Sequence, residues 1–445
     1  MLDDPVTAIV DAASAMTSRD GICDVQMRLV RFLLSAGETA RARDMADAID
    51  DADELGTRSR AFARAQVASA LFAGGDQAGA MALVDRAVDD LIVAAGDDAD
   101  DVSDIGVVGF ILFLEGPGET ALALAAAGRA GPWRSGALSE IGETAALAGD
   151  RETLDTVLEG LAFDEAAARG PAWTALALAV GGEREAAWEA AGDLPVAADR
   201  ALAWAYVAQA EAQADDEEKA GAALAHMFRD LDALDDAWQV LDALTIGIGI
   251  IAQTGEIEAA SRVIEKIDSP VVADWLRRDM VEVLVANGDI ADATSWARRI
   301  DGEVTRDHAW ERMACILCDA GRLEEAREVA ATIGHDNFRC RAFHHLAACS
   351  AAGRQAENAA GDAAEDMARA VAVAVELPHA QRIDLAPKLA RGMVDYLAPS
   401  ALDDARKSLA SIVGGKSEDR IAALLWLAWL DLCQSDPSAG IDSAA

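Results

Sequence analysis

The chain has 445 residues, of which 78 are acidic and 38 basic, so its formal net charge is −40. Nucleic acids and anionic membrane surfaces are bound by clustered Lys and Arg, and the sequence has no such cluster, so we expect neither as a partner. The longest apolar runs, 107–114 and 421–430, are much shorter than the roughly 20 residues that a membrane-spanning helix needs.

A Gly followed by a charged residue recurs along the chain and marks the predicted elements in order. Three of the intervals between these Gly (149–182, 255–288 and 288–321) are equal, with a period of about 33 residues that is typical of stacked helical hairpins. Gly ends a helix because it adopts a positive φ at little steric cost. Each unit is therefore predicted to contain a helix, a Gly turn, a second helix and a short link. The marker positions are Gly37, Gly75, Gly118, Gly149, Gly182, Gly255, Gly288, Gly321 and Gly353.

Two intervals depart from the period. The interval from Gly182 to Gly255 is slightly more than twice the period, which predicts two units with one marker lost, and the missing turn is expected near Asp215. The interval from Gly75 to Gly118 exceeds one unit because of an acidic insertion at 96–104, which we interpret as a surface loop.

The residues behind each Gly form an amphipathic pattern. After Gly321, the apolar residues at offsets 2, 5, 8, 9 and 12 lie on one face of a predicted helix. The residue at offset 5 is Ala after seven of the nine Gly, with Leu154 and Asn358 as exceptions, which predicts a close crossing of two helices. The acidic residue after the Gly is expected to cap the next helix in six units: Glu38, Asp76, Asp150, Glu183, Glu256 and Asp289.

The unit 307–338 resembles the tetratricopeptide (TPR) and TPR-like repeats. Its first helix has the family's large, large, small, large pattern, and its turn and second-helix start also match, at these residues: Trp310, Met313, Ala314, Leu317, Gly321, Leu323, Glu324, Glu325 and Ala326. The resemblance implies an all-α fold, an α-solenoid of antiparallel helix pairs in a right-handed superhelix. It implies a concave groove whose first-helix residues bind a partner, and no enzymatic activity. Most links lack the family's closing Pro, and Arg277 is the counterpart of Trp310 one unit earlier, so other α-solenoid types stay open.

The domain prediction follows the markers. We expect a TPR-like array over 1–359, a C-terminal helical continuation or cap over 360–433, and a flexible tail over 434–445. The ten Trp are predicted core residues, Trp238 among them, and Trp275 is the one to test for exposure in the groove.

Composition also suggests a compartment. Only five of the 38 basic residues are Lys, and an acidic, Lys-poor chain suggests a high-salt cytoplasm such as a halophile's, with a GC-rich genome as the alternative. The N-terminus lacks the basic start and apolar core of a signal peptide, and six Cys in a long chain do not form a disulfide framework. We therefore expect a cytoplasmic protein.

The segment 308–349 holds most of the Cys and His residues. Cys315 and Cys318 form a C-x-x-C pair on a helix, and together with His308 and His344 they could bind Zn²⁺. Structural zinc sites usually hold this motif in a tight turn, and Cys is a common small core residue, so packing is the favoured interpretation and no cofactor is expected. The segment 411–417 lacks the first Gly and the preceding strand of a phosphate loop. The acidic residues at 97–104 lack the Gly and Glu of an EF-hand.

The resulting functional prediction is a non-catalytic scaffold that binds a basic or amphipathic protein or peptide in its groove. No nucleophile–base pair suggests an enzyme. Two alternatives remain open: a metal- or redox-responsive module that uses the cluster at 308–349, and the sensor subunit of a regulatory complex. The candidate partner contacts are Trp275, Arg278, Glu282, His308, Glu311 and Arg341.

Overall fold

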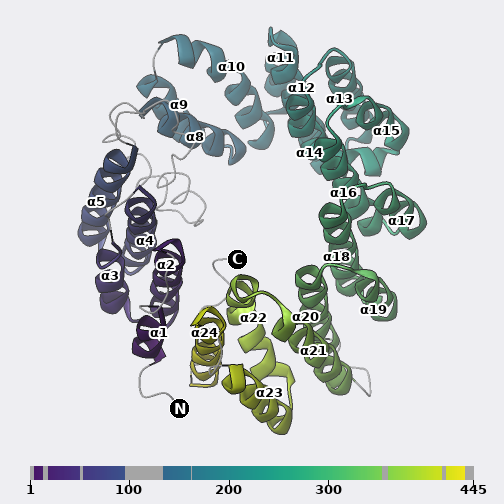
Figure 1. The fold of residues 1–445 in the computed structure, drawn as a ribbon. Helices are drawn as coiled ribbons and strands as arrows, with labels where there is room; N and C mark the ends of the chain where they lie inside the picture. The colour runs from purple at the N-terminus through teal and green to yellow at the C-terminus, as the bar shows by residue number, and fades with distance from the viewer. Residues whose placement is uncertain are drawn as a thin grey trace. The chain divides into compact units, whose positions relative to one another are not determined.

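The computed structural model describes residues 5–13, 19–50, 54–95, 134–161, 163–352, 359–412 and 417–435. These residues form 22 α-helices and no β-strand, so the all-α prediction is confirmed for them (Figure 1). Within the same ranges, no helix is long and apolar enough to cross a membrane. The predicted loop at 96–104, the markers Gly118 and Gly353, and the tail beyond residue 435 lie outside the described residues.

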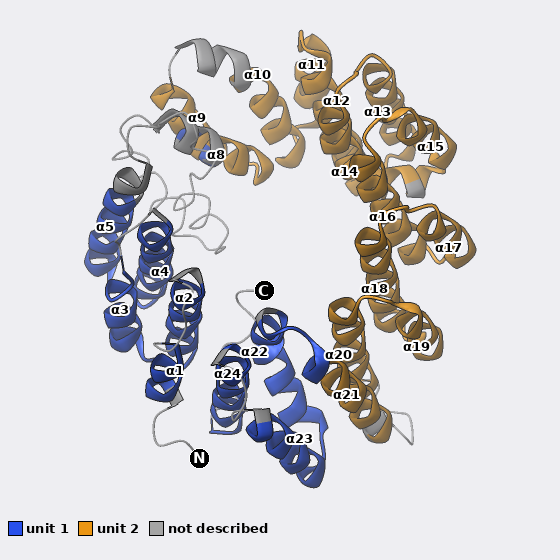
Figure 2. Ribbon diagram, viewed as in Figure 1, with its two compact units in different colours: residues 1–141, 374–445 blue, residues 142–373 orange. Residues whose placement is uncertain are grey.

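The chain divides into two compact units (Figure 2). The first unit contains residues 1–141 and 374–445, and the second contains residues 142–373. The C-terminal residues thus group with the N-terminal ones, a division that the marker pattern does not predict.

In the second unit, long first helices alternate with shorter second helices from α10 to α19. From α10 to α18, each first helix contacts its own second helix and the next first helix. Figure 1 shows α12, α14, α16 and α18 in one row, with α13, α15, α17 and α19 in a second row beside them. After α8 (Arg134–Leu147), which spans the boundary between the units, the helices are α9 (Arg151–Gly160), α10 (Phe163–Val180), α11 (Arg184–Asp193), α12 (Ala197–Gln213), α13 (Glu217–Leu231), α14 (Ala237–Thr254), α15 (Ile257–Lys266), α16 (Pro270–Ala286), α17 (Ile290–Arg298), α18 (Glu303–Asp319), α19 (Leu323–Thr332), α20 (Asp336–Ala352) and α21 (Ala359–Glu376).

The marker Gly end helices as predicted. At Gly321, with φ 75°, the Gly N–H donates to the carbonyl of Cys318 (2.8 Å), and the N–H of Arg322 donates to the carbonyl of Leu317 (2.8 Å). This pair of bonds is the Schellman motif, which satisfies carbonyls that the helix end leaves free. The markers that have a positive φ are Gly37, Gly75, Gly149, Gly182, Gly255, Gly288 and Gly321.

The lost marker lies at Asp215, as predicted. Asp215 has a φ of 57°, and among the described residues it is the one non-Gly residue with a positive φ. The N–H of Asp216 donates to the carbonyl of Glu211 (3.0 Å), as at the Gly turns. The interval 182–255 therefore contains two helix pairs.

The capping prediction holds for some of the acidic residues. Asp76 Oδ1 accepts from the N–H of Gly79 (2.9 Å), and Asp150 Oδ1 accepts from the N–H of Thr153 (3.1 Å). The prediction is wrong for four residues, whose side chains make no cap hydrogen bond: Glu38, Glu183, Glu256 and Asp289. Glu38 instead accepts from Arg41 (2.7 Å) and Glu183 from Arg151 (3.2 Å), and nothing in the structure explains Glu256 or Asp289.

The recurrent Ala is buried in every described unit that has it. At this position, five residues after the turn, Ala is completely buried, as the predicted close helix crossing requires. The residues are Ala42, Ala80, Ala187, Ala220, Ala260, Ala293 and Ala326, each with 0% exposure.

Buried acidic residues link neighbouring helix pairs in the second unit. Asp274 on α16 accepts from the N–H groups of Asp301 (3.2 Å) and Gly302 (2.8 Å), in the link before α18. Asp307 is at the equivalent position of the next helix pair, on α18, and accepts from the N–H of His335 (2.7 Å), in the link before α20. A buried carboxylate thus fixes where the next first helix begins.

The first unit joins the two ends of the chain. Its other helices are α1 (Pro5–Ala13), α2 (Arg19–Ser35), α3 (Thr39–Asp47), α4 (Glu54–Ala73), α5 (Gln77–Ala95), α22 (His379–Tyr396), α23 (Pro399–Ile412) and α24 (Ser417–Ser435). Helix α1 contacts α24, and the Phe32 ring meets the Trp429 ring edge to face at 5.1 Å. Trp426 is completely buried, as predicted for a core Trp.

Candidate functional site

The six predicted partner contacts lie on three consecutive first helices. Trp275, Arg278 and Glu282 are on α16, His308 and Glu311 are on α18, and Arg341 is on α20. Because α16 contacts α18 and α18 contacts α20, these helices form adjacent strips of one surface.

Ion pairs connect the three helices. Arg312 Nε on α18 lies 3.1 Å from Glu282 Oε1 on α16, and Arg341 Nε on α20 lies 3.0 Å from Glu311 Oε1 on α18. The Glu311 side chain is only 3% exposed, and burial raises its pKa. Glu311 therefore positions Arg341, which is 45% exposed, and is itself too deep to contact a partner.

His308 is a packed side chain. Its ring stacks on Phe338 with centroids 5.2 Å apart, and its Nε2 lies 3.6 Å from Glu311 Oε2. Burial, followed by the nearby charges of Arg278 and Arg341, lowers its pKa to about 4. The imidazole is neutral at physiological pH and serves as part of the surface between α18 and α20.

A row of exposed apolar side chains lies at the start of the first helices. Trp238, Val271 and Val304 are the second residues of α14, α16 and α18, recur once per repeat, and are 55%, 55% and 58% exposed. We call them the apolar row. The half-buried Trp275 meets the Trp238 ring at 5.4 Å. The sequence prediction that Trp238 is a core residue is wrong, and the recurrence of the row at the repeat period is the signal that could have identified it.

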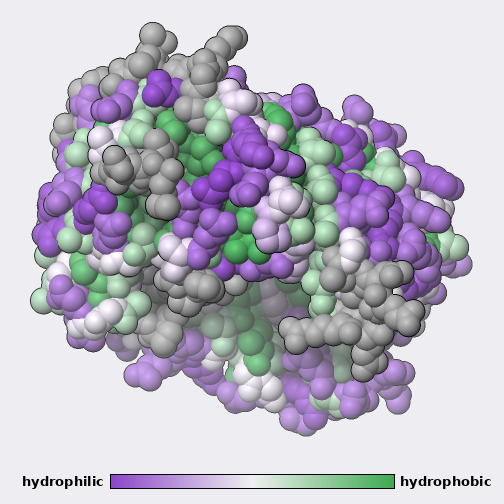
Figure 3. Space-filling view, turned by 90° about the horizontal axis from the view of Figure 1, so that it is seen from below, coloured by the Kyte–Doolittle hydropathy of each residue, from purple (hydrophilic) through white to green (hydrophobic). Residues whose placement is uncertain are grey.

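The apolar row is the longer of two such series among the described residues, since Leu147 and Val180, the last residues of α8 and α10, are also one period apart and are 43% and 39% exposed. Figure 3 shows one face of the molecule, on which hydrophilic and apolar residues are interspersed. A periodic series of exposed large apolar groups is a marker of interaction surfaces, since single exposed apolar residues need no explanation but aligned ones do.

The Cys and His residues of 308–349 form a different cluster from the predicted one. Among the described residues, Asp319, His345 and Cys349 offer ligand atoms that all lie within 4.8 Å of one another. His345 Nε2 is 2.8 Å from Asp319 Oδ1, and Cys349 Sγ is 3.5 Å from the same oxygen. Cys318, on α18, also interacts with Cys349, and we call these four residues the thiol cluster. Of the four predicted ligands, it contains Cys318 and not His308, Cys315 or His344.

Hydrogen bonds within the thiol cluster favour a charged pair. Donation from Cys318, and then from His345, lowers the pKa of Cys349 to about 6. The bond to Cys349, followed by the one to Asp319, raises the pKa of His345 to about 9. These shifts favour a Cys349 thiolate beside a His345 imidazolium. Burial instead raises the pKa of Cys315 and of Cys340 to about 12, which keeps both as inert thiols.

The sequence contained a signal for this cluster. His345 and Cys349 are four residues apart, which places them on one face of α20. The alignment with the TPR pattern favoured the neighbouring His344 instead of His345. The contact with Asp319, at the end of α18, depends on how helices of two consecutive helix pairs meet.

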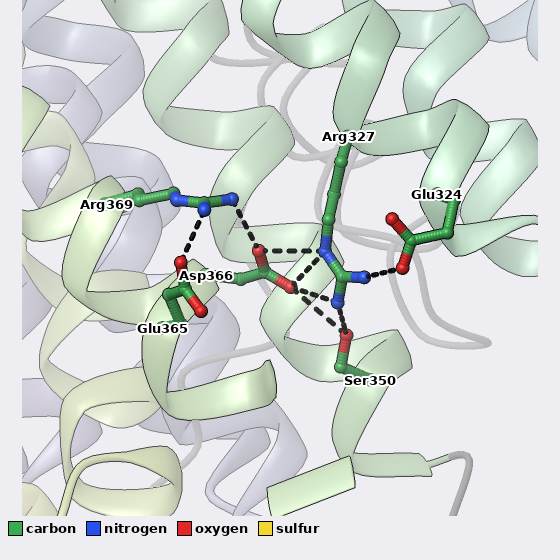
Figure 4. A network of polar contacts seen from close by, with 6 residues as sticks. All are labelled: Glu324, Arg327, Ser350, Glu365, Asp366 and Arg369. Carbon is green, nitrogen blue, oxygen red and sulfur yellow. Dashed lines mark hydrogen bonds and ion pairs between the residues drawn. The ribbon is translucent and has the colours of Figure 1, made fainter. Parts of the chain in front are cut away.

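A buried polar network joins α19, α20 and α21 (Figure 4). Asp366, on α21, is 1% exposed and accepts from Arg327 Nη2 (2.9 Å) and from Ser350 Oγ (3.2 Å). The hydrogen bond to Asp366 raises the pKa of Arg327, and Arg369 also reaches the carboxylate. Both carboxylate oxygens have donors, so the network is a structural clamp without a free catalytic group.

Comparison with known proteins adds no family assignment. No protein-family model matches the chain, and no curated protein matches it at a significant level.

Proposed function

We propose that the chain is an α-solenoid of TPR-like helix pairs and acts as a non-catalytic scaffold. Its first-helix face on α14, α16 and α18 binds a basic or amphipathic segment of a partner protein. The observation that carries this proposal is the apolar row, which recurs at the repeat period.

The spacing of the row suits an extended ligand. Trp238, Val271 and Val304 occupy the same place in three consecutive helix pairs, so one partner segment that runs across the first helices could meet all three. Trp275 beside Trp238 adds an aromatic group of the kind that dominates interface energies.

Charge supports a basic partner. The formal net charge is −40, and such a field attracts cationic segments and speeds their association. The exposed Arg341 and Arg312 are each bound to a Glu of the protein itself, so they add little net positive charge to the face.

Affinity capture with matched variants tests the proposal. The binding variant carries Trp238→Ser, Val271→Ser and Val304→Ser, and the control carries Val180→Ser and Leu147→Ser, two exposed apolar sites elsewhere in the second unit. We expect a partner that wild type and control recover at native salt and that the binding variant loses by at least about tenfold, since centrally placed contacts each contribute about 1.4 kcal/mol or more. Equal recovery by all three proteins would refute the proposed face.

A further inference from the structure

We propose that the thiol cluster, made of Cys318, Asp319, His345 and Cys349, binds one Zn²⁺ ion at the contact between α18 and α20. This site is independent of the apolar row and of the scaffold function.

Three of the four side chains already lie together, and Cys318 beside Cys349 can supply the fourth donor atom. Zn²⁺ is bound by Cys sulfur, His nitrogen and carboxylate oxygen, and structural sites are almost always four-coordinate and tetrahedral. The cluster offers Sγ of Cys318 and Cys349, Nε2 of His345 and Oδ1 of Asp319. His345 Nε2, Asp319 Oδ1 and Cys349 Sγ all lie within 4.8 Å of one another, so one ion could reach them together with small side-chain movements.

The chemistry of the set selects a soft cation. Two thiolates and an imidazole favour Zn²⁺ over Mg²⁺ or Ca²⁺, which take oxygen ligands. The thiol of Cys318 and the imidazolium of His345 each release a proton when the metal binds. The two thiolates and the Asp319 carboxylate then carry three negative charges against the two positive charges of the ion. The contacts that now join Cys318 and His345 to Cys349, and His345 to Asp319, are replaced by bonds to the metal.

The repeat itself provides an internal comparison. One period earlier, at the contact between α16 and α18, the positions of Cys318, Asp319, His345 and Cys349 are occupied by Val285, Ala286, Arg312 and Ile316. Two first helices pack there as well, with no Cys or His at any of the four equivalent positions. Packing of helix pairs therefore does not require the four donor residues, and their concentration at one junction needs another explanation.

The cluster is open to solvent. The Asp319 side chain is 63% exposed and that of His345 is 36% exposed, while Cys349 is half-buried. An ion can therefore enter along the Asp319 side without unfolding the helices. Cys318 and Asp319 lie at the end of α18, and His345 and Cys349 lie on α20. The metal would therefore join two consecutive helix pairs.

Cobalt substitution tests the site in the full-length protein. The protein is reduced, freed of metal with a chelator and titrated with Co²⁺, whose tetrahedral thiolate complexes give a sulfur-to-metal charge-transfer band and intense visible bands. We expect both signals to saturate at one equivalent and to disappear when Zn²⁺ is added. No charge-transfer band, or a stoichiometry other than one, would overturn the proposal.

Variants locate the bound ion. Cys349→Ser and His345→Gln should each weaken Co²⁺ binding by more than about 100-fold, because even the loss of outer-shell partners costs about 10- to 100-fold. Cys315→Ser, one turn from Cys318 on the same helix, should leave affinity unchanged, and circular dichroism checks that each variant is folded. Unchanged binding by Cys349→Ser, or an equal loss in Cys315→Ser, would contradict the assignment. Neither readout depends on a protein partner, so the metal site and the scaffold function can fail separately.

Discussion

The turn at Gly288 provides a quantitative test of the repeat architecture. Gly288 follows the end of α16 with a φ of 89°, and a Cβ added there meets nothing within 4 Å. The substitution Gly288→Ala therefore introduces no clash, and its effect comes from the backbone conformation alone. Gly221, inside α13, also has nothing within 4 Å of an added Cβ, but it has no positive φ, so Gly221→Ala is a matched control.

The two substitutions should act in opposite directions. A left-handed conformation costs an L-residue about 1–2 kcal/mol, which exceeds the entropy that Ala saves in the unfolded chain, so Gly288→Ala should lose about 1 kcal/mol of unfolding free energy. In a helix, Ala is more favourable than Gly by about 0.5–1 kcal/mol, so Gly221→Ala should gain that amount. The expected difference between the variants is about 2 kcal/mol, the sum of the two effects.

Urea unfolding followed by circular dichroism measures both variants against the wild type. Hydrogen exchange at the amides of Gly288 and Asp289, which donate to Val285 and Leu284, reports whether the change is local to the turn. If both variants shifted the unfolding midpoint in the same direction, the left-handed turn would not be the feature that Gly288 supplies.

Three further predictions concern charge. Arg327→Met removes the main partner of the buried Asp366 carboxylate and should cost about 3–5 kcal/mol of unfolding free energy in urea, whereas a loss below about 1 kcal/mol would show that the clamp is dispensable. The pKa of Cys349 is lowered to about 6 and that of Cys340 is raised to about 12, so iodoacetamide should alkylate Cys349 at a rate that rises through pH 6 and then levels off. Mass spectrometry follows the labelling, and equal labelling of both residues at pH 7 would contradict this prediction. KCl at 1 M should raise the midpoint of thermal unfolding. The Debye length falls from about 10 Å at 0.1 M to about 3 Å at 1 M, so the salt screens the repulsion within a chain whose net charge is −40. A lower midpoint would mean that the ion pairs of the fold contribute more than this repulsion costs.

The helix turns could be predicted because their cause is local. A Gly at a helix end changes the conformation of one residue, and the apolar period behind it directs one face inward, so both signals are complete within a single unit. Asp215 was found from the spacing and from the apolar residues at the matching offsets behind it, without a Gly to mark the turn.

The remaining features depend on contacts between distant residues. Nothing in the marker pattern requires Phe32 to meet Trp429 or α1 to contact α24, because these helices are separated by nearly the whole chain. The buried acceptors Asp274 and Asp307 look like ordinary surface acids in a chain with 78 acidic residues. One of the four members of the thiol cluster, Cys318, was identified from the sequence, whereas its contact with Cys349 comes from the crossing of two helices.

Photo-crosslinking from the apolar row tests the central claim most directly. A photoreactive phenylalanine analogue is placed at Val271, and separately at the exposed Val180 as a control, and each full-length protein is irradiated in native lysate at high salt. We predict a specific crosslinked partner from Val271, mapped to a basic or amphipathic segment, and none from Val180. Crosslinks of equal yield from both positions, or none from Val271, would contradict a partner-binding face on the first helices.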